Sequence, residues 1–128
     1  MKTLASWMIT PDGTKLQSFH RHDYKTHIDA VTGEEYMIDG GLEYTRTSQN
    51  IVPAAYHTVT SKDSHELVRE NFHWGTRGKD GKQPLTWKPL CDLDKDHIEA
   101  IIDTQHHISD ELRKVFETEL SARGAGLI

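Results

Sequence analysis

Histidine is unusually frequent in this chain, with nine among 128 residues, and the densest group lies in residues 20–27, which read HRHDYKTH. In an extended strand, side chains two positions apart share a face, so His20 and His22 are expected to project together. Paired imidazoles suit Zn²⁺ or Fe²⁺, particularly when a carboxylate completes the ligand set. The sequence therefore predicts a metal site made by His20, His22 and Asp39, with Asp39 supplied by a neighbouring strand.

The same segment could carry hydrolytic chemistry. With a divalent metal on the two paired histidines, Asp23 or Asp39 would orient water or ligand, and His27 would shuttle a proton. A straight strand places His27 on the opposite face, so a bulge near Asp23 or a bend just after it would be needed. The candidate catalytic residues are His22, Asp23 and His27. A purely structural alternative stays open, in which water, tyrosine or backbone groups satisfy each imidazole.

A second candidate site lies in residues 74–87, which combine glycines, basic side chains and two flanking indoles. Backbone N–H groups beside glycine can approach an anion, Arg and Lys neutralise phosphate, and Trp stacks on a base. The segment lacks the residue order of a P-loop or a dinucleotide-binding fingerprint. The alternative is a solvated hairpin turn at residues 79–82 whose tryptophans anchor it to the core. The candidate ligand-binding residues are Trp74, Arg77, Lys79, Lys82 and Trp87.

Strands are needed to position the first of these sites. Residues 6–10 are predicted to form a strand that ends at the turn 11–14, and residues 15–29 to form the returning strand. A third strand follows at residues 35–39, where apolar side chains alternate, so a three-stranded meander is the simplest arrangement. Two further candidate strands are residues 54–60 and 85–88, and residues 42–52 have no assignment.

Capping residues and apolar periodicity predict three helices. Asp63, with Glu66 three positions later, has the spacing of a capping box for one short helix. Asp94 and Ser109 are expected to cap two longer helices, which form a helical hairpin whose apolar faces cover the sheet. The predicted fold class is α+β: a small curved antiparallel sheet, begun by the N-terminal meander, packed by a C-terminal helical hairpin and one short helix in a single domain, 1–128.

Composition and charge limit the class of protein. The net charge of −5 disfavours duplex DNA as a partner, whereas the basic segment at 71–90 suits a smaller anion. Acidic side chains are concentrated in residues 91–128, which allows a protein that imitates DNA through Glu117 and Glu119. Cys91 is the only cysteine, so an internal disulfide and a Cys-rich zinc site are excluded. Without an apolar run of about 20 residues, no membrane span is expected, and a reducing cytoplasm fits best.

Four blocks of the chain together resemble a family of small uncharacterised bacteriophage proteins. The blocks are residues 20–29, 36–41, 74–81 and 97–123, so the likeness covers nearly the whole chain. The resemblance implies a protein made during phage infection or encoded by a prophage, acting in the host bacterial cytoplasm. It implies no biochemical role and carries over no catalytic residue.

The expected function is that of a phage accessory protein that binds a nucleotide-like or other anionic ligand, or a host protein. The ligand would occupy a cleft where residues 20–27 meet residues 74–87. One alternative is a small hydrolase of a phosphodiester or nucleotide that depends on a divalent metal, Zn or Fe. The other alternative is an acidic inhibitor of a host DNA-binding protein.

Overall fold

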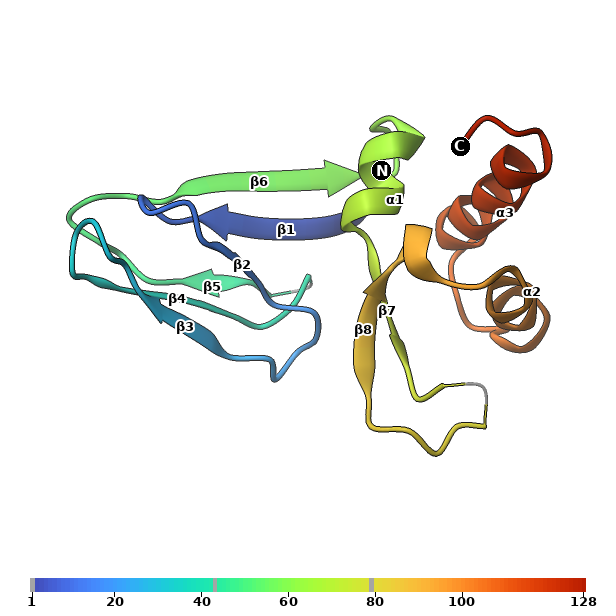
Figure 1. Cartoon of the computed structure of the whole chain (residues 1–128), viewed down its shortest axis with the longest axis horizontal. Coiled ribbons are helices and arrows are strands. Elements are labelled where there is room, and N and C mark those ends of the chain that lie inside the picture. The colour runs from blue at the N-terminus through green and yellow to red at the C-terminus, as the bar shows by residue number, and fades with distance from the viewer. Residues whose placement is uncertain (1, 43, 79) are drawn as a thin grey trace. The chain divides into compact units, whose positions relative to one another are not determined.

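The structure is a computed structural model, and it describes residues 2–42, 44–78 and 80–128. Its strands form three small antiparallel sheets with the orders β2-β1-β6, β3-β4-β5 and β7-β8, so the predicted α+β class is confirmed (Figure 1). The elements in chain order are β1 (Thr3–Ile9), β2 (Lys15–Gln17), β3 (Lys25–Ile28), β4 (Glu35–Asp39), β5 (Arg46–Thr47), β6 (Ala55–Thr60), α1 (His65–Asn71), β7 (His73–Thr76), β8 (Thr86–Pro89), the 3₁₀ turn η1 (Leu90–Asp92), α2 (Lys95–Thr104) and α3 (Asp110–Gly124).

The chain divides into two compact units. The N-terminal unit is Ala5–Thr58, and the C-terminal unit combines Met1–Leu4 with Val59–Ile128. The organisation of residues 1–128 as one domain stays a prediction, as does a cleft shared by residues 20–27 and 74–87, because those segments belong to different units. No helix in the described ranges has both the length and the apolar character that crossing a membrane requires.

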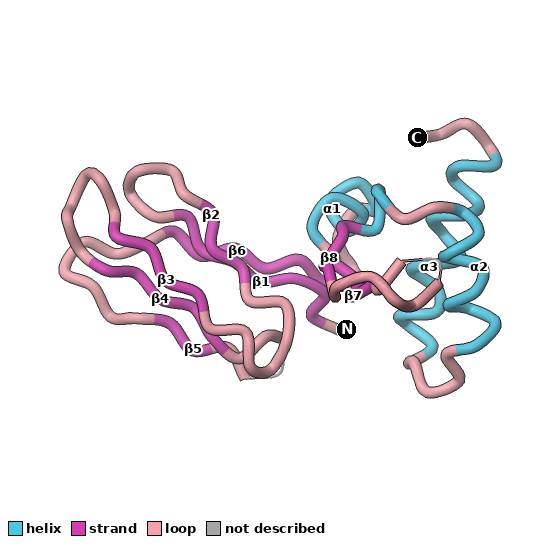
Figure 2. The backbone as a smooth tube through the Cα atoms, turned by 60° about the horizontal axis from the view of Figure 1, so that its bottom comes forward, coloured by secondary structure: helices cyan, strands magenta, loops and turns pink. Residues whose placement is uncertain are grey.

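The N-terminal unit is built from strands, drawn in magenta in Figure 2. Antiparallel pairing joins β1 to β2 and β3 to β4, and β5 extends the second pair as a meander. Tyr36 and Ile38 of β4 are buried while Glu35 is exposed, as the apolar alternation predicted. The core of this unit comprises Met8, Leu16, Tyr36, Ile38 and Ala54.

The prediction of one returning strand over residues 15–29 is wrong. The chain forms β2, then turns, and only then forms β3. Side chains create this turn: the Ser18 hydroxyl donates to the Asp23 carbonyl at 2.7 Å, and the Asp23 carboxylate accepts the Phe19 amide at 2.9 Å. Ser and Asp compete in this way with the hydrogen bonding of a strand. The histidines at positions 20 and 22 therefore lie in a turn rather than on one face of a strand.

Every helix in the described part of the chain lies in the C-terminal unit. Ser109 caps α3 by accepting the Leu112 amide at 3.2 Å, and Asp94 precedes α2, both at the predicted positions. Ser64, one residue after the predicted Asp63, caps α1. Helices α2 and α3 contact each other, and α3 also contacts α1 and η1. The helical hairpin and the short helix are thus present, and the predicted strand at 54–60 is found as β6.

The β7–β8 hairpin occupies the segment predicted as a glycine-rich loop. Strand β8 matches the predicted strand at 85–88, whereas β7 was not predicted. Gly75 pairs with Trp87 across the hairpin, and a Cβ on Gly75 would lie 3.2 Å from the Trp87 ring. On the other side, the Trp74 ring meets Phe116 of α3 edge-on at 5.3 Å. The paired strands of the hairpin alternative and the anchoring of Trp74 to the core are therefore present, while Lys79 of the predicted turn lies outside the described residues.

Candidate functional site

One group of potential metal ligands is assembled among the described residues, and we call it the Asp–His–Asp cluster: Asp12, His27 and Asp29. Their ligand atoms all lie within 4.8 Å of one another. Asp12 lies in the turn between β1 and β2, His27 is on β3, and Asp29 directly follows β3. The Nε2 atom of His27 is 2.7 Å from Oδ2 of Asp12.

Hydrogen bonds fix the two carboxylates of this cluster. The Asp12 carboxylate accepts hydrogen bonds from the Thr14 and Ala30 amides. The Asp29 carboxylate accepts hydrogen bonds from the Asp12, Val31 and Thr32 amides. The Ala30 amide contributes most to lowering the pKa of Asp12 far below its usual range. Burial raises the pKa of Asp29, but the amide hydrogen bonds outweigh burial and lower it. Both carboxylates are therefore ionised at neutral pH.

The predicted ligands His20, His22 and Asp39 are not brought together by the structure. The ligand atoms of this set do not all lie within the distance found in the Asp–His–Asp cluster. His20 and His22 are exposed in the turn after β2, and the Asp39 carboxylate forms an ion pair with Arg46. Their role as metal ligands stays a prediction.

The predicted catalytic residues, His22, Asp23 and His27, do not contact a common partner either. His27 pairs with Asp12, while the Asp23 carboxylate caps the turn and lies 3.3 Å from the ammonium of Lys25. His22 joins neither pair. The sequence prediction thus included His27 but missed its carboxylate partners, because Asp12 was interpreted only as part of a turn.

A pocket of about 460 Å³ lies in the N-terminal unit beside this turn. We call it the tyrosine–arginine pocket, and its lining is Arg21, His22, Tyr24, Asp39, Gly40, Tyr44 and Arg46. The Tyr24 and Tyr44 side chains are 58% and 72% exposed, so their rings are accessible. Two of the lining residues, His22 and Asp39, were predicted as site residues. Tyr44 and Arg46 come from residues 42–52, the segment that had no assignment.

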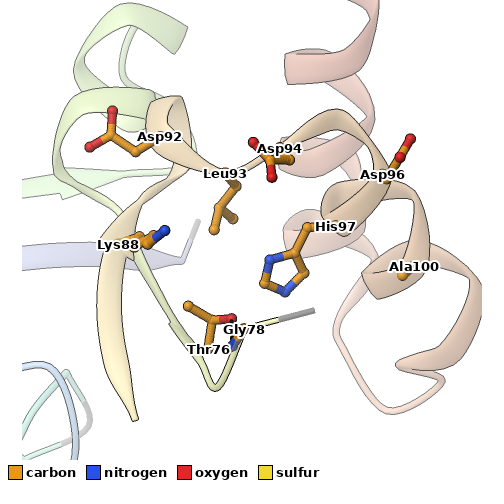
Figure 3. Close-up of a pocket in the computed structure, with 9 residues that line it drawn as sticks. All are labelled: Thr76, Gly78, Lys88, Asp92, Leu93, Asp94, Asp96, His97 and Ala100. Carbon is orange, nitrogen blue, oxygen red and sulfur yellow. Dashed lines mark hydrogen bonds between the residues drawn. The ribbon is translucent and has the colours of Figure 1, made fainter. Parts of the chain in front are cut away.

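A second pocket, of about 370 Å³, lies in the C-terminal unit between the β7–β8 hairpin and α2. Figure 3 shows the Lys88 amine and the His97 ring turned into this pocket, with the carboxylates of Asp92 and Asp96 directed away from its centre. Asp94 also lines it. The lining thus carries three aspartates and one lysine, and this net negative charge opposes a multiply charged anion.

The predicted ligand-binding residues of the hairpin differ in exposure. Trp74 and Trp87 are half-buried, whereas Arg77 and Lys82 are exposed in the connection between β7 and β8. Lys79 lies outside the described residues. The backbone at Gly78 adopts a φ of +80°, which favours glycine, and accepts the Gly81 amide at 3.3 Å. Thr76 and Gly78 from this hairpin line the second pocket, but Trp74, Arg77, Lys82 and Trp87, the described ligand-binding candidates, do not.

One acidic residue assigned to DNA imitation is not on the surface. Glu119 is fully buried, and its carboxylate accepts hydrogen bonds from Arg69, Arg123 and His65. It is unavailable to a partner, because its negative charge is already paired inside the C-terminal unit. Glu117 is exposed and keeps the predicted surface position.

Comparison with known proteins identifies no relative of this chain. No protein-family model matches the chain, and neither does any curated protein or solved structure. The resemblance to bacteriophage proteins therefore stays a prediction, and the functional argument depends on the sites described above.

Proposed function

We propose that the protein binds a small anionic ligand that carries an aromatic ring, such as a nucleotide, in the tyrosine–arginine pocket. The observation that carries the proposal is the charge balance of the lining. Asp39 is its one carboxylate among the described lining residues, and its charge is paired with Arg46. The charge of Arg21 is left for a ligand, because no ion pair joins Arg21 to another described residue.

The lining supplies the two kinds of contact that a nucleotide needs. The guanidinium of Arg21 and the imidazole of His22 can donate hydrogen bonds to phosphate oxygens. The exposed rings of Tyr24 and Tyr44 can stack on a base. The pocket volume of about 460 Å³ falls within the range of roughly 300–1,000 Å³ typical of small-molecule sites.

The charge of the second pocket makes it a weaker candidate for the same ligand. Its three aspartates would repel a phosphate, and Lys88 offsets only one of them. The anionic ligand predicted from the hairpin residues is therefore better accommodated by residues from the histidine-rich turn.

The resemblance to small bacteriophage proteins supports a biological setting for this binding activity. In that setting the protein is a phage accessory factor that acts in the host bacterial cytoplasm on a nucleotide-like ligand. A host protein is the alternative partner, for which the exposed tyrosines of the pocket would be the contact residues.

The two other predicted functions have less support. A metal-dependent hydrolase based on His22, Asp23 and His27 would need these side chains to act together. In the structure, Asp23 pairs with Lys25 and His27 pairs with Asp12. An inhibitor that imitates DNA would lose Glu119 from its acidic surface, since that residue is buried.

Calorimetric titration of the full chain with nucleoside mono- and triphosphates tests the proposal. The Arg21→Ala variant should bind at least tenfold more weakly, because hydrogen bonds to charged groups contribute about 1.5–3 kcal/mol. Arg77→Ala is the matched control, as it removes an exposed arginine outside the pocket. Loss of binding in Arg77→Ala with retention in Arg21→Ala would move the ligand to the hairpin, and no binding by the unmodified protein would reject a nucleotide.

A second pair of variants tests stacking. Tyr44→Ala should weaken binding, whereas Tyr56→Ala removes an exposed tyrosine outside the pocket and should not. Equal effects in the two variants would argue against a base stacked on Tyr44.

A further inference from the structure

We propose that the Asp–His–Asp cluster is a binding site for a divalent first-row transition metal such as Zn²⁺. The three residues come from different parts of the N-terminal unit, and the fold brings their ligand atoms within 4.8 Å of one another. This site is independent of the tyrosine–arginine pocket, since the two share no residue.

The donor set fits this class of metal. One imidazole nitrogen with two carboxylate oxygens is a combination that Zn²⁺, Fe²⁺ and Mn²⁺ accept, whereas Ca²⁺ prefers oxygen donors alone. The Asp29 side chain is almost fully buried, while His27 is 29% exposed, so one side of the cluster faces solvent. Water can therefore supply a fourth ligand from that side.

The hydrogen bonds of the two carboxylates are compatible with a metal. In the structure, Oδ2 of Asp12 accepts from Ala30 and pairs with His27, and Oδ1 of Asp29 accepts from the Asp12 amide. If the metal binds these two oxygens, each of them keeps one backbone hydrogen bond. Hydrogen bonds of this kind commonly orient the carboxylates that bind a metal and stabilise their ionised form.

For the pair His27 and Asp12, the rearrangement required is small. The metal takes the place of the proton between Nε2 of His27 and Asp12, and the neutral ring then carries its single proton on Nδ1. Ligands on a tetrahedral zinc, with bonds of about 2.0–2.1 Å, lie about 3.3 Å apart. The present separation is 2.7 Å, so the His27 ring has to withdraw by roughly half an ångström, and its position at the solvent side of the cluster permits this.

The competing explanation is that the three residues only join two turns. The variant His27→Gln separates the two explanations, because a glutamine amide can still donate to Asp12 but is a poor ligand for zinc. His22→Ala is the matched control, since it removes an exposed histidine of the set predicted from sequence.

The experiment titrates Zn²⁺, and Co²⁺ as a spectroscopic probe, into the untagged full chain without nucleotide. The unmodified protein and His22→Ala should each bind about one ion per chain and show a higher melting temperature with metal. His27→Gln should keep its near-ultraviolet circular dichroism but bind at least tenfold more weakly, with no metal-dependent rise in melting temperature. Absence of binding by the unmodified protein, equal binding by His27→Gln, or loss confined to His22→Ala would each overturn the proposal. Because no nucleotide is present, these outcomes are independent of the nucleotide titration.

Discussion

Arg69 donates from Nε and Nη2 to the two carboxylate oxygens of Glu119, at 2.9 and 3.1 Å. Arg123 donates to the same carboxylate at 2.6 Å, and His65 lies within hydrogen-bonding distance at 2.9 Å. Arg123 also reaches the Leu90 carbonyl of η1 at 3.2 Å. One buried carboxylate therefore joins α1 to α3, and through Arg123 the connection continues to η1. Removing it would leave two guanidinium groups without their shared partner.

The first prediction concerns this carboxylate. Glu119→Gln should lower the free energy of unfolding by about 3–5 kcal/mol, since breaking a buried ion pair leaves uncompensated charge. Glu117→Gln, two residues earlier and exposed, should change it by no more than about 0.5 kcal/mol. Chemical denaturation at neutral pH measures both. Similar values for the two variants would mean that the buried ion pair contributes little.

The second prediction is a dependence of stability on pH. Burial raises the pKa of Glu119, but hydrogen bonds from Arg69, Arg123 and His65 outweigh it and lower the pKa from 4.5 to about 2. Because the folded-state pKa is the lower one, the stabilisation is complete above about pH 5 and is lost as the pH falls towards 2. The loss should amount to about 3 kcal/mol. Urea unfolding at several pH values should give a shallower decline for Glu119→Gln than for the unmodified chain.

The third prediction concerns the aromatic centre of the C-terminal unit. Phe116 is fully buried and meets Phe72 edge-on at 5.9 Å as well as Trp74. Phe116→Ala should cost about 3–5 kcal/mol of unfolding free energy, and Phe116→Leu less, because the cavity is smaller. Leu67→Ala in the exposed part of α1 is the control. The near-ultraviolet circular dichroism of Trp74 should change only in the Phe116 variants.

The fourth prediction compares two glycines with positive φ. A Cβ on Gly40, where φ is +96°, would overlap the Tyr44 carbonyl oxygen, whereas Gly33, at +73°, has open space around it. Gly33→Ala should cost about 1 kcal/mol from backbone strain alone. Gly40→Ala should cost about 3 kcal/mol, since the backbone must also move. Gly40 lines the tyrosine–arginine pocket, so only its substitution should also weaken nucleotide binding.

Local signals in the sequence predicted the parts of the fold that depend on neighbouring residues. Ser109 and Asp94 mark helix starts because capping acts within one turn of helix, and Tyr36 and Ile38 mark the buried face of β4. Strand β5 has only two residues, too few for a periodic pattern. The turn after β2 depends on side-chain bonds from Ser18 and Asp23 that compete with strand formation.

The sites were harder to predict than the elements. Asp12 and His27 are 15 positions apart, and they meet only because strands of two different sheets lie against each other. The turn at residues 11–14 was predicted, but turn propensity does not reveal which side chain its aspartate will meet. Tyr44 and Arg46 of the tyrosine–arginine pocket carry no periodic signal, so only the fold shows that they line it together with His22.

The bond from the Asp12 amide to Oδ1 of Asp29 has a consequence for local opening. Turn amides usually exchange their hydrogen with water quickly, because their protection ends when the turn alone frays. Here the acceptor is a carboxylate that is 1% exposed and also holds the Val31 and Thr32 amides of the turn after β3. Hydrogen exchange at Asp12 therefore requires the two turns to separate, so its rate should report that separation rather than fraying of the first turn alone.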